Sequence, residues 1–568
     1  MKHLFLKLIC LTLCLLFAVG SVGCGKKDNT ERDNGEISMF KWDFSSLNSA
    51  RRSNSPIYSV VKGKAHGYEL KSETCGYGDW ESTINNLYNT GNLPDVFIHY
   101  AVDRPDTFKK MIKNGSVLNY ADYITQASHP NLYKRLHEYD WLVERVDYLK
   151  GGYYFLPITI KQTHVMFVRK DWIDNLNDKL ANILVAEGIV LSASAMTEAL
   201  YEQYKFVLPQ TLTEFYRLAK AFTIYDPDNN GKNDTYGYTC SGNLMWYNNW
   251  VFEAMGNTYW GWVPDGSGSY SASWVTEENK NAVAFLNKLY EEGIMDPDYT
   301  AMTDATKIQN FCSNRTGIMV DNIYYNTYVE QLRAANNLTT EQAEAAIAVI
   351  APPKGENGTY GLRGNPGFWC GTCINADISR NKIGAILDML EFMLSEEGYD
   401  TFTYGVEGMH YKVENGEKVS LMGQDSNGYN FTAKAKDTAF DLHMFVDWSL
   451  NYNPGFSTNY EKVNAYMEMA EEYSYIDDYS YIQTPLVIEN WDNIGKESYE
   501  YFIRLISTNY GNDAYNRSTI GNADWDSIKV SASKYNDDWS KFVNTFLNSW
   551  QGNSMIQEYA AEAAKYKK

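Results

Sequence analysis

Oxygen-bearing residues alternate along one short segment of this chain, beginning at residue 226. The oxygen donors are the side chains of Asp226, Asp228, Asn230 and Asp234 and the backbone carbonyl of Lys232. Alternate oxygen ligands around a glycine, here Gly231, are how an EF-hand-like loop wraps a hard cation. Calcium has no redox chemistry, and the segment directly follows a helical pattern. We therefore expect a Ca²⁺ ion with a structural role in this metal loop, residues 226–237.

The metal loop is incomplete at one position. An EF-hand places a bidentate Glu at its twelfth residue, but Gly237 stands there. Water or a remote acid must therefore complete the coordination shell. The alternative is an Asx-rich turn that holds no ion. That turn would leave three acids unpaired close together, and their mutual repulsion favours the calcium interpretation.

Two helices have clear start signals. Thr211 and Glu214 form a capping box ahead of an apolar helical stripe, which predicts the helix that leads into the metal loop. Residues 275–293 repeat this design, with Thr276 as the cap and Gly293 as the stop. Both helices are amphipathic and must therefore cover an apolar surface.

Further along the chain, helical and strand patterns alternate. Residues 383–394 carry an apolar stripe, and we expect Gly398 to close this helix as a C-cap. Residues 93–100, 153–160 and 164–168 are short apolar runs that predict buried strands. This alternation predicts an α/β architecture.

Length and composition narrow the class of protein. The chain has 568 residues, which is several times the commonest domain size and predicts two or more lobes. Its 45 tyrosines and 15 tryptophans supply many flat side chains with a polar atom. A formal net charge of −21 argues against nucleic acid as a partner, because phosphates must be neutralised by Lys and Arg.

The N-terminus has the pattern of an export signal. Residues 1–23 combine a positive start with an apolar run too short to span a membrane comfortably. The segment ends in "SVGC", which resembles the lipobox of bacterial lipoproteins and makes Cys24 the lipidated residue, although Ser21 stands where Leu is usual. The alternative is an ordinary signal peptide with an incidental cysteine. Residues 24–37 are polar and predict a flexible tether.

The segment "FWCGTC" imitates a redox motif, with Cys370 and Cys373 two residues apart. A redox dithiol of that type opens a helix directly after a strand, whereas "INADIS" follows here. We therefore predict a buried strand. The sequence contains no Gly-rich phosphate loop and no Gly-x-Ser-x-Gly motif.

Several stretches together resemble one family: "RKDWIDNL", "PQTLTEFYRLAKAF", "DPDNNGKNDTYG", "GIMDPDY" and "YGVEGMHY". They resemble the extracellular solute-binding protein family 1 lipoproteins of carbohydrate ABC importers. Members near this chain, and an alginate-binding relative with bound calcium, carry the same loop. Two departures stand out. The segment 177–208 is an insertion, and Thr235 replaces an acid that often follows the last Asp of the loop.

The resemblance implies a two-lobed periplasmic-binding-protein-like α/β fold with a ligand cleft between the lobes. The expected parts are a signal peptide 1–23, a tether 24–37, lobe 1 at 38–160, lobe 2 at 161–350, a lobe 1 return at 351–404, and a lobe 2 return with C-terminal helices at 405–568.

A sugar-binding cleft needs aromatic platforms for apolar C–H faces and planar polar groups for hydroxyls. In open α/β sheets such groups lie on the loops after strand ends. Some candidates follow predicted strands, some follow the metal loop or match aromatic positions in maltodextrin-binding proteins, and some lie near the lobe crossings. The candidates are Trp42, Asp43, Tyr100, Trp246, Tyr247, Trp250, Asp321, Asn322, Tyr324, Trp369, Glu407 and His410.

The resulting hypothesis is a monomeric, calcium-stabilised lipoprotein that is not an enzyme. It would sit lipid-anchored on the extracellular face of a bacterial cytoplasmic membrane, bind an oligosaccharide and deliver it to the permease of an ABC importer. Two other classes stay open. A secreted lipoprotein glycoside hydrolase would use a carboxylate pair, and a ligand-loaded sensor partner would dock on a receptor kinase.

Overall fold

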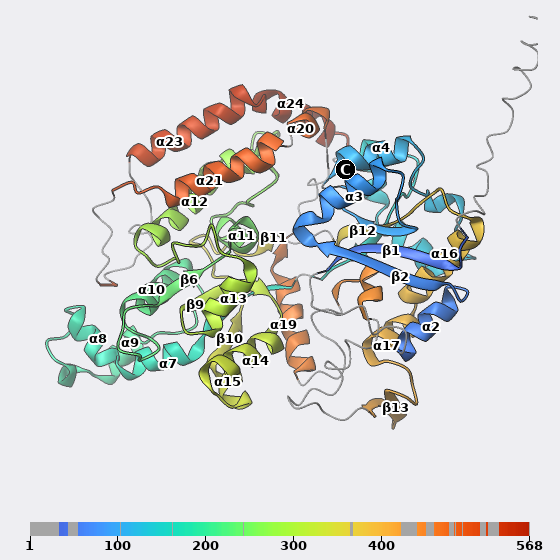
Figure 1. Ribbon diagram of the computed structural model, residues 1–568. Helices are drawn as coiled ribbons and strands as arrows, with labels where there is room; N and C mark the ends of the chain where they lie inside the picture. The colour runs from blue at the N-terminus through green and yellow to red at the C-terminus, as the bar shows by residue number, and fades with distance from the viewer. Residues whose placement is uncertain are drawn as a thin grey trace, which may run out of the picture.

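The computed structural model has two α/β lobes, which lie on the right and left of Figure 1. It describes residues 33–43, 55–102, 104–161, 163–241, 244–363, 367–421, 440–449, 459–475, 482, 484–490, 492–511, 519–520 and 533–566. Cys24 lies outside the described residues.

Lobe 1 contains a five-stranded sheet. Its strand order is β2 (Glu69–Gly76), β1 (Glu36–Asp43), β3 (Val96–His99), β12 (Phe368–Ile374) and β4 (Leu156–Thr159). β1 is parallel to β2 and β3, and β12 is antiparallel to β3 and β4. The helices of this lobe are α2 (Pro56–Lys64), α3 (Trp80–Asn89), α4 (Pro105–Lys113), α5 (Pro130–His137), α6 (Asp140–Arg145), α16 (Arg380–Leu394) and α17 (Glu396–Tyr404).

Lobe 2 contains a four-stranded sheet. Its strand order is β10 (Ile347–Ile350), β5 (His164–Arg169), β9 (Thr316–Asn322) and β6 (Tyr236–Thr239). Its helices are α7 (Lys170–Asp178), α8 (Leu180–Ala186), α9 (Glu198–Tyr204), α10 (Leu212–Ile224), α11 (Leu244–Ala254), α12 (Glu277–Glu291), α13 (Asp304–Cys312), α14 (Tyr325–Asn336) and α15 (Thr340–Ala346). A small hairpin, β7 (Trp262–Pro264) and β8 (Tyr270–Ala272), lies beside them.

The C-terminal third of the chain contributes to both lobes. Its elements are the hairpin β13 (Tyr411–Glu414) and β14 (Glu417–Ser420), and the helices α19 (Tyr460–Glu472), α20 (Pro485–Glu489), η10 (Asn493–Glu497), α21 (Ser498–Ser507), α23 (Ser533–Asn544) and α24 (Gly552–Ala563). The helices after α19 pack mainly on lobe 2, where the Asn287 side chain donates to the carbonyls of Leu505 and Ile506. The chain end returns to lobe 1, where the Tyr566 hydroxyl donates to the Glu144 carbonyl at 3.2 Å.

Residues 440–449 lie on lobe 1, beyond the limit of residue 404 expected from the sequence. The Trp448 amide donates to the Thr159 carbonyl at 2.8 Å, and the Thr372 hydroxyl donates to the Phe445 carbonyl at 2.6 Å. This short segment therefore extends the β4 edge of the lobe 1 sheet. Its pairing partners are more than 70 residues away, so no local pattern marks it.

The helix start signals are confirmed, and one helix stop is wrong. The capping box of Thr211 and Glu214 opens α10, and Thr276 caps α12. Gly398, however, is not the C-cap of α16, because that helix ends at Leu394 and Gly398 lies in the first turn of α17. A Cβ at this position would stand 1.9 Å from the Phe392 carbonyl oxygen. Close backbone approach therefore requires the glycine.

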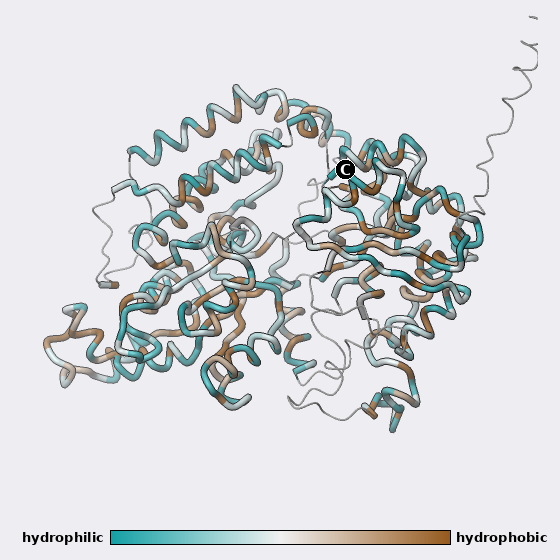
Figure 2. Tube along the Cα trace, viewed as in Figure 1, coloured by the Kyte–Doolittle hydropathy of each residue, from teal (hydrophilic) through white to brown (hydrophobic). Residues whose placement is uncertain are grey.

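Hydrophobic segments concentrate inside each lobe, and hydrophilic ones run along outer helices such as α23 (Figure 2). The insertion 177–208 folds as α8 and α9 and projects from lobe 2 (Figure 1). Its tip exposes apolar side chains, with Leu191 fully exposed. Among the described residues, no helix combines the length and the apolar character needed to cross a membrane.

Candidate functional site in the interlobe cleft

In each sheet, several strands end or begin on the side near the other lobe. We call these two rows of strand ends the lobe 1 edge and the lobe 2 edge. In lobe 1, β1 and β3 end at this edge and the antiparallel β12 begins there, since Phe368 pairs with Thr159 at the end of β4. In lobe 2, β9 ends and β5 begins together, because Asn322 pairs with His164. The connection from Thr159 to His164 is only four residues long, so these two edges must lie close together.

The lobe 1 edge carries a continuous run of aromatic rings. Ring centroids lie 4.8 Å apart for Trp80 and Tyr100, 5.4 Å for Tyr100 and Trp369, and 5.5 Å for Trp369 and Trp448. All three contacts are edge-to-face, a preferred aromatic geometry, and Trp369 is half-buried and so keeps part of its ring accessible. Sequence reasoning missed Trp80 and Trp448, whose positions depend on distant segments.

Trp42 and Asp43 end β1 at the same edge, where Trp42 pairs with Cys75. Only their backbone is described. The structure thus gives their place in the sheet, and their role in binding stays a prediction.

The lobe 2 edge gathers a second group of predicted residues around His164. The centroid of its ring lies 4.7 Å from that of Trp246 and 6.2 Å from that of Tyr247. The Thr163 hydroxyl donates to the Asn322 side-chain oxygen at 2.9 Å, which ties the lobe crossing to the end of β9. Trp246 is half-buried and so is Tyr324 at the start of α14, which leaves both rings partly accessible.

A buried ion pair inside lobe 2 contacts residues of this edge. Lys307 Nζ lies 3.0 Å from a carboxylate oxygen of Asp321, and both side chains are at most 4% exposed. The same ammonium lies 3.2 Å from the centroid of the Tyr247 ring. Burial raises the pKa of the Asp321 carboxyl, and Lys307 opposes that rise. Asp321 and Tyr247 are therefore held from within lobe 2, which leaves Trp246 and Tyr324 as the more accessible groups.

Three predicted site residues lie elsewhere. Trp250 is fully buried; its indole N–H donates to the Tyr238 hydroxyl and its ring packs on Phe215 in the core of lobe 2. Glu407 and His410 lie in the turn before β13, at the lower tip of lobe 1 in Figure 1 and away from the strand edges. His410 has a local role there, because its Nδ1 accepts from the Val406 amide.

The "FWCGTC" segment is a buried strand, as predicted. Cys370 and Cys373 lie in β12 and are at most 1% exposed. Burial raises the pKa of the Cys373 thiol well above its usual value, which disfavours the thiolate that redox chemistry needs.

The metal loop turns its oxygen atoms inward after α10. The Asp226 carboxylate accepts from the amides of Asn230 and Gly231. The Asn230 side-chain nitrogen lies between two carboxylates, 2.9 Å from Asp228 and 3.1 Å from Asp234. A cation held by Asp228 and Asp234 would lie where this side-chain nitrogen lies now. The other carboxylate oxygen of Asp228 is buried and has no hydrogen-bond partner among the described residues.

These residues fit a hard cation only with some rearrangement. No three His, Cys, Asp or Glu side chains in the described ranges gather closely enough to hold a metal. A flip of the Asn230 side-chain amide would exchange its nitrogen for an oxygen ligand. Thr235 cannot replace the missing acid while its hydroxyl donates to the Phe222 carbonyl at 2.6 Å.

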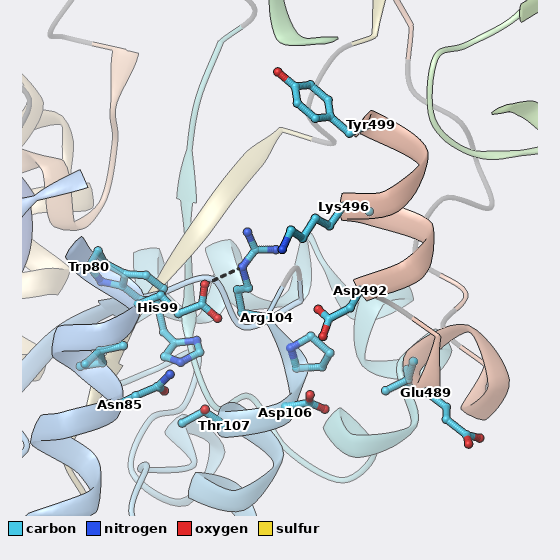
Figure 3. Close-up of a pocket in the computed structure, with 15 residues that line it drawn as sticks. Trp80, Asn85, His99, Arg104, Asp106, Thr107, Glu489, Asp492, Lys496 and Tyr499 are labelled. Atoms are coloured by element: carbon cyan, nitrogen blue, oxygen red, sulfur yellow. Dashed lines mark hydrogen bonds and ion pairs between the residues drawn. The ribbon is translucent and has the colours of Figure 1, made fainter. Parts of the chain in front are cut away.

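A cavity of about 550 Å³ lies beside the lobe 1 edge, between α3 and α4 on one side and the C-terminal helices on the other. Figure 3 shows Trp80 and His99 on the lobe 1 side, with Asp492 and Lys496 reaching in from the C-terminal helices. Trp80 connects this cavity to the cleft, since its ring contacts both His99 and Tyr100.

His99 and His164 are buried next to the two edges, and burial lowers the pKa of each to about 3. An unfolded histidine titrates near 6.5, so between pH 6.5 and 3 the unfolded chain binds more protons. Stability is therefore expected to fall as the pH drops below 6.5, by about 1.4 kcal/mol per pH unit for each histidine. Urea unfolding at pH 7 and pH 5.5 measures the change in the free energy of unfolding. In the His99→Gln/His164→Gln variant, this free energy should fall less between the two pH values. An equally steep loss in that variant would contradict the prediction.

Two α/β lobes that are joined by a short crossing, with aromatic rings at the strand ends of each, have the arrangement of a ligand-binding protein of the solute-binding class. A family model described as bacterial extracellular solute-binding protein matches residues 63–407, and the chain belongs to this family.

Two relatives are similar to this chain in sequence, and one solved structure is similar to it in fold. The chain is 25% identical over 368 residues to the polygalacturonan/rhamnogalacturonan-binding protein YtcQ of Bacillus subtilis; the match covers 64% of this chain and only 63% of YtcQ. It is 23% identical to lipoprotein LipO of the same organism, with 72% and 74% covered. The structure of the S. pneumoniae ABC-transporter substrate-binding protein FusA, as an EF-hand mutant with fructo-nystose, has a TM-score of 0.60 at 14% identity, covering 94% of this chain and 100% of FusA.

Proposed function

We propose that the protein binds an oligosaccharide between its lobes, outside the bacterial cytoplasmic membrane, and delivers it to the permease of an ABC importer. The observation that carries this proposal is the presence of a half-buried aromatic ring at each edge, Trp369 in lobe 1 and Trp246 in lobe 2. Such rings can stack on the C–H faces of a sugar, while Asn322 and its neighbours supply hydrogen bonds.

Closure of the lobes would couple binding to transport. A ligand that contacts both edges favours the closed arrangement by the difference in its affinity for the two states. The short connection from Thr159 to His164 can act as the hinge, because it links the edges directly. A permease that recognises the closed form would then accept loaded protein in preference to empty protein.

Two further parts of the proposal rest on local features. Ca²⁺ would be held by Asp226, Asp228, Asn230, Asp234 and the Lys232 carbonyl, where it would fix the shape of the metal loop; the buried, unpartnered oxygen of Asp228 supports this. Lipidation at Cys24 would anchor the chain, and the relative LipO is named a lipoprotein.

Replacement of Trp246 with alanine tests the cleft. We expect binding to weaken by about 1–2 kcal/mol, roughly 5- to 30-fold, because a stacking platform is lost. Calorimetry with the tightest glycan from an array measures the change, and recovery of that glycan intact distinguishes binding from hydrolysis. Tyr123→Ala, an exposed tyrosine outside the cleft, serves as the control. Unchanged affinity in Trp246→Ala would place the sugar elsewhere.

A further inference from the structure

The cavity beside the lobe 1 edge has the features of a built ligand site. Its volume of about 550 Å³ falls within the range of small-molecule sites. His99 lines it, is only 1% exposed, and has an Nδ1 atom without a hydrogen-bond partner among the described residues. A buried polar atom without a partner is costly, and a ligand hydroxyl in the cavity can satisfy it.

The walls come from both halves of the molecule. Trp80, His99, Arg104 and Asp106 belong to α3, β3 and α4 of lobe 1 or to the loop between β3 and α4. Glu489, Asp492 and Lys496 belong to the C-terminal helices, which pack mainly on lobe 2. A ligand in this cavity therefore contacts the parts of the protein that approach each other on closure.

Charge is unevenly divided among the lining residues. The carboxylates are Glu81, Asp106, Glu489 and Asp492, and the cations are Arg104 and Lys496. Arg104 Nε lies 3.0 Å from a carboxylate oxygen of Glu81. Figure 3 marks this ion pair by the dashed line to Arg104. His99 adds no positive charge, because burial lowers its pKa to about 3. Beyond the Arg104–Glu81 pair, the lining contains one further cation, Lys496, and three carboxylates.

We propose that this cavity is a saccharide subsite that selects neutral or amino sugars and rejects uronates, an inference that rests on the proposed function. Carboxylates accept hydrogen bonds from sugar hydroxyls, and Asn85 and Thr107 add donors. A uronate would bring a further negative charge into a cavity that already has excess negative charge, and charges within a Debye length repel. The sugars that this subsite would select thus differ in charge from polygalacturonan, which YtcQ is named for binding.

The test compares glycans that differ only at C6. An array with pairs of oligosaccharides, such as galactotriose and trigalacturonate, gives the first result, and calorimetry with each bound pair gives the ratio of affinities. We expect the neutral member to bind at least about tenfold more tightly, because one further like charge at close range is sufficient for that ratio. Uronates that bind as tightly as their neutral partners would overturn the inference and leave the proposed function intact. Binding of no glycan would overturn the proposed function itself.

A charge variant links the selectivity to the cavity. In Asp106→Asn/Asp492→Asn, the preference for the neutral member should shrink to under about threefold, because two repelling charges are removed with little change in shape. Asp122→Asn, an exposed acid elsewhere on lobe 1, should keep the wild-type ratio. If the ratio of the double variant equals that of the wild type while its melting temperature is unchanged, the cavity is not the source of the selectivity.

Discussion

Replacement of Lys307 with methionine is expected to lower the free energy of unfolding by about 3–5 kcal/mol, the usual cost of breaking a buried ion pair from one side. Lys307 is fully buried, lies 3.0 Å from Asp321 and donates to the Val320 carbonyl. Its removal leaves the Asp321 carboxylate, which is 4% exposed, without its counter-charge. Urea unfolding at pH 7 measures the loss.

Two variants distinguish the cost of an unpaired buried charge from the cost of lost packing. Lys307→Met/Asp321→Asn removes both charges and should recover much of the loss, because no unpaired charge stays buried. Lys170→Met removes an exposed partner of Asp174 and should change the free energy of unfolding by less than about 1 kcal/mol. A loss below about 1 kcal/mol in Lys307→Met would show that the pair adds little. Sugar binding should weaken as well, since the same ammonium packs against Tyr247 beside Trp246.

Removal of calcium is expected to lower the melting temperature of the protein. If Ca²⁺ binds the folded metal loop at 100 times its dissociation constant, the linkage contributes about 2.7 kcal/mol, and about 4.1 kcal/mol at 1,000 times. Scanning calorimetry in excess Ca²⁺ and in EDTA measures the difference. The candidate ligands lie in one loop, where the Asn230 side-chain nitrogen donates to the carboxylates of Asp228 and Asp234; a cation in that position would require this side chain to rearrange.

The calcium prediction has a matched control within the chain. Asp228→Asn should abolish the difference between the two conditions. Asp265→Asn alters another polar turn, in which Asp265 accepts from the Ser267 and Ser269 amides, and should leave the difference intact. Equal melting temperatures of the wild type in Ca²⁺ and in EDTA would leave the loop as an Asx-rich turn without an ion.

The local features of this protein could be predicted from the sequence. The capping box at Thr211 and Glu214, the cap at Thr276 and the buried strand at "FWCGTC" were predicted and are present. Each depends on contacts between residues a few positions apart, or on an apolar run long enough to require burial. The resemblance to solute-binding proteins likewise gave the two-lobed fold, because it lies in motifs spread along most of the chain.

The candidate site could be predicted only in part from the sequence. Trp246 and Trp250 lie one helical turn apart on α11, and the sequence gives no reason to separate them. The structure places Trp246 beside His164 at the edge and Trp250 against Phe215 in the core. One turn of a helix moves a side chain by about 5 Å along the axis, which is enough to take it from the cleft into the interior.

The sequence by itself determined the helices, the buried strands and the oxygen-rich composition of the metal loop, since these follow from neighbouring residues. The tertiary structure alone decided which rings line the cleft, that Lys307 supports Asp321, and that residues 440–449 bring Trp448 to Trp369. The Lys307–Asp321 pair joins residues 14 positions apart, and the Trp369–Trp448 contact joins residues 79 positions apart. Their formation depends on strand order and lobe packing, which no short stretch of sequence encodes.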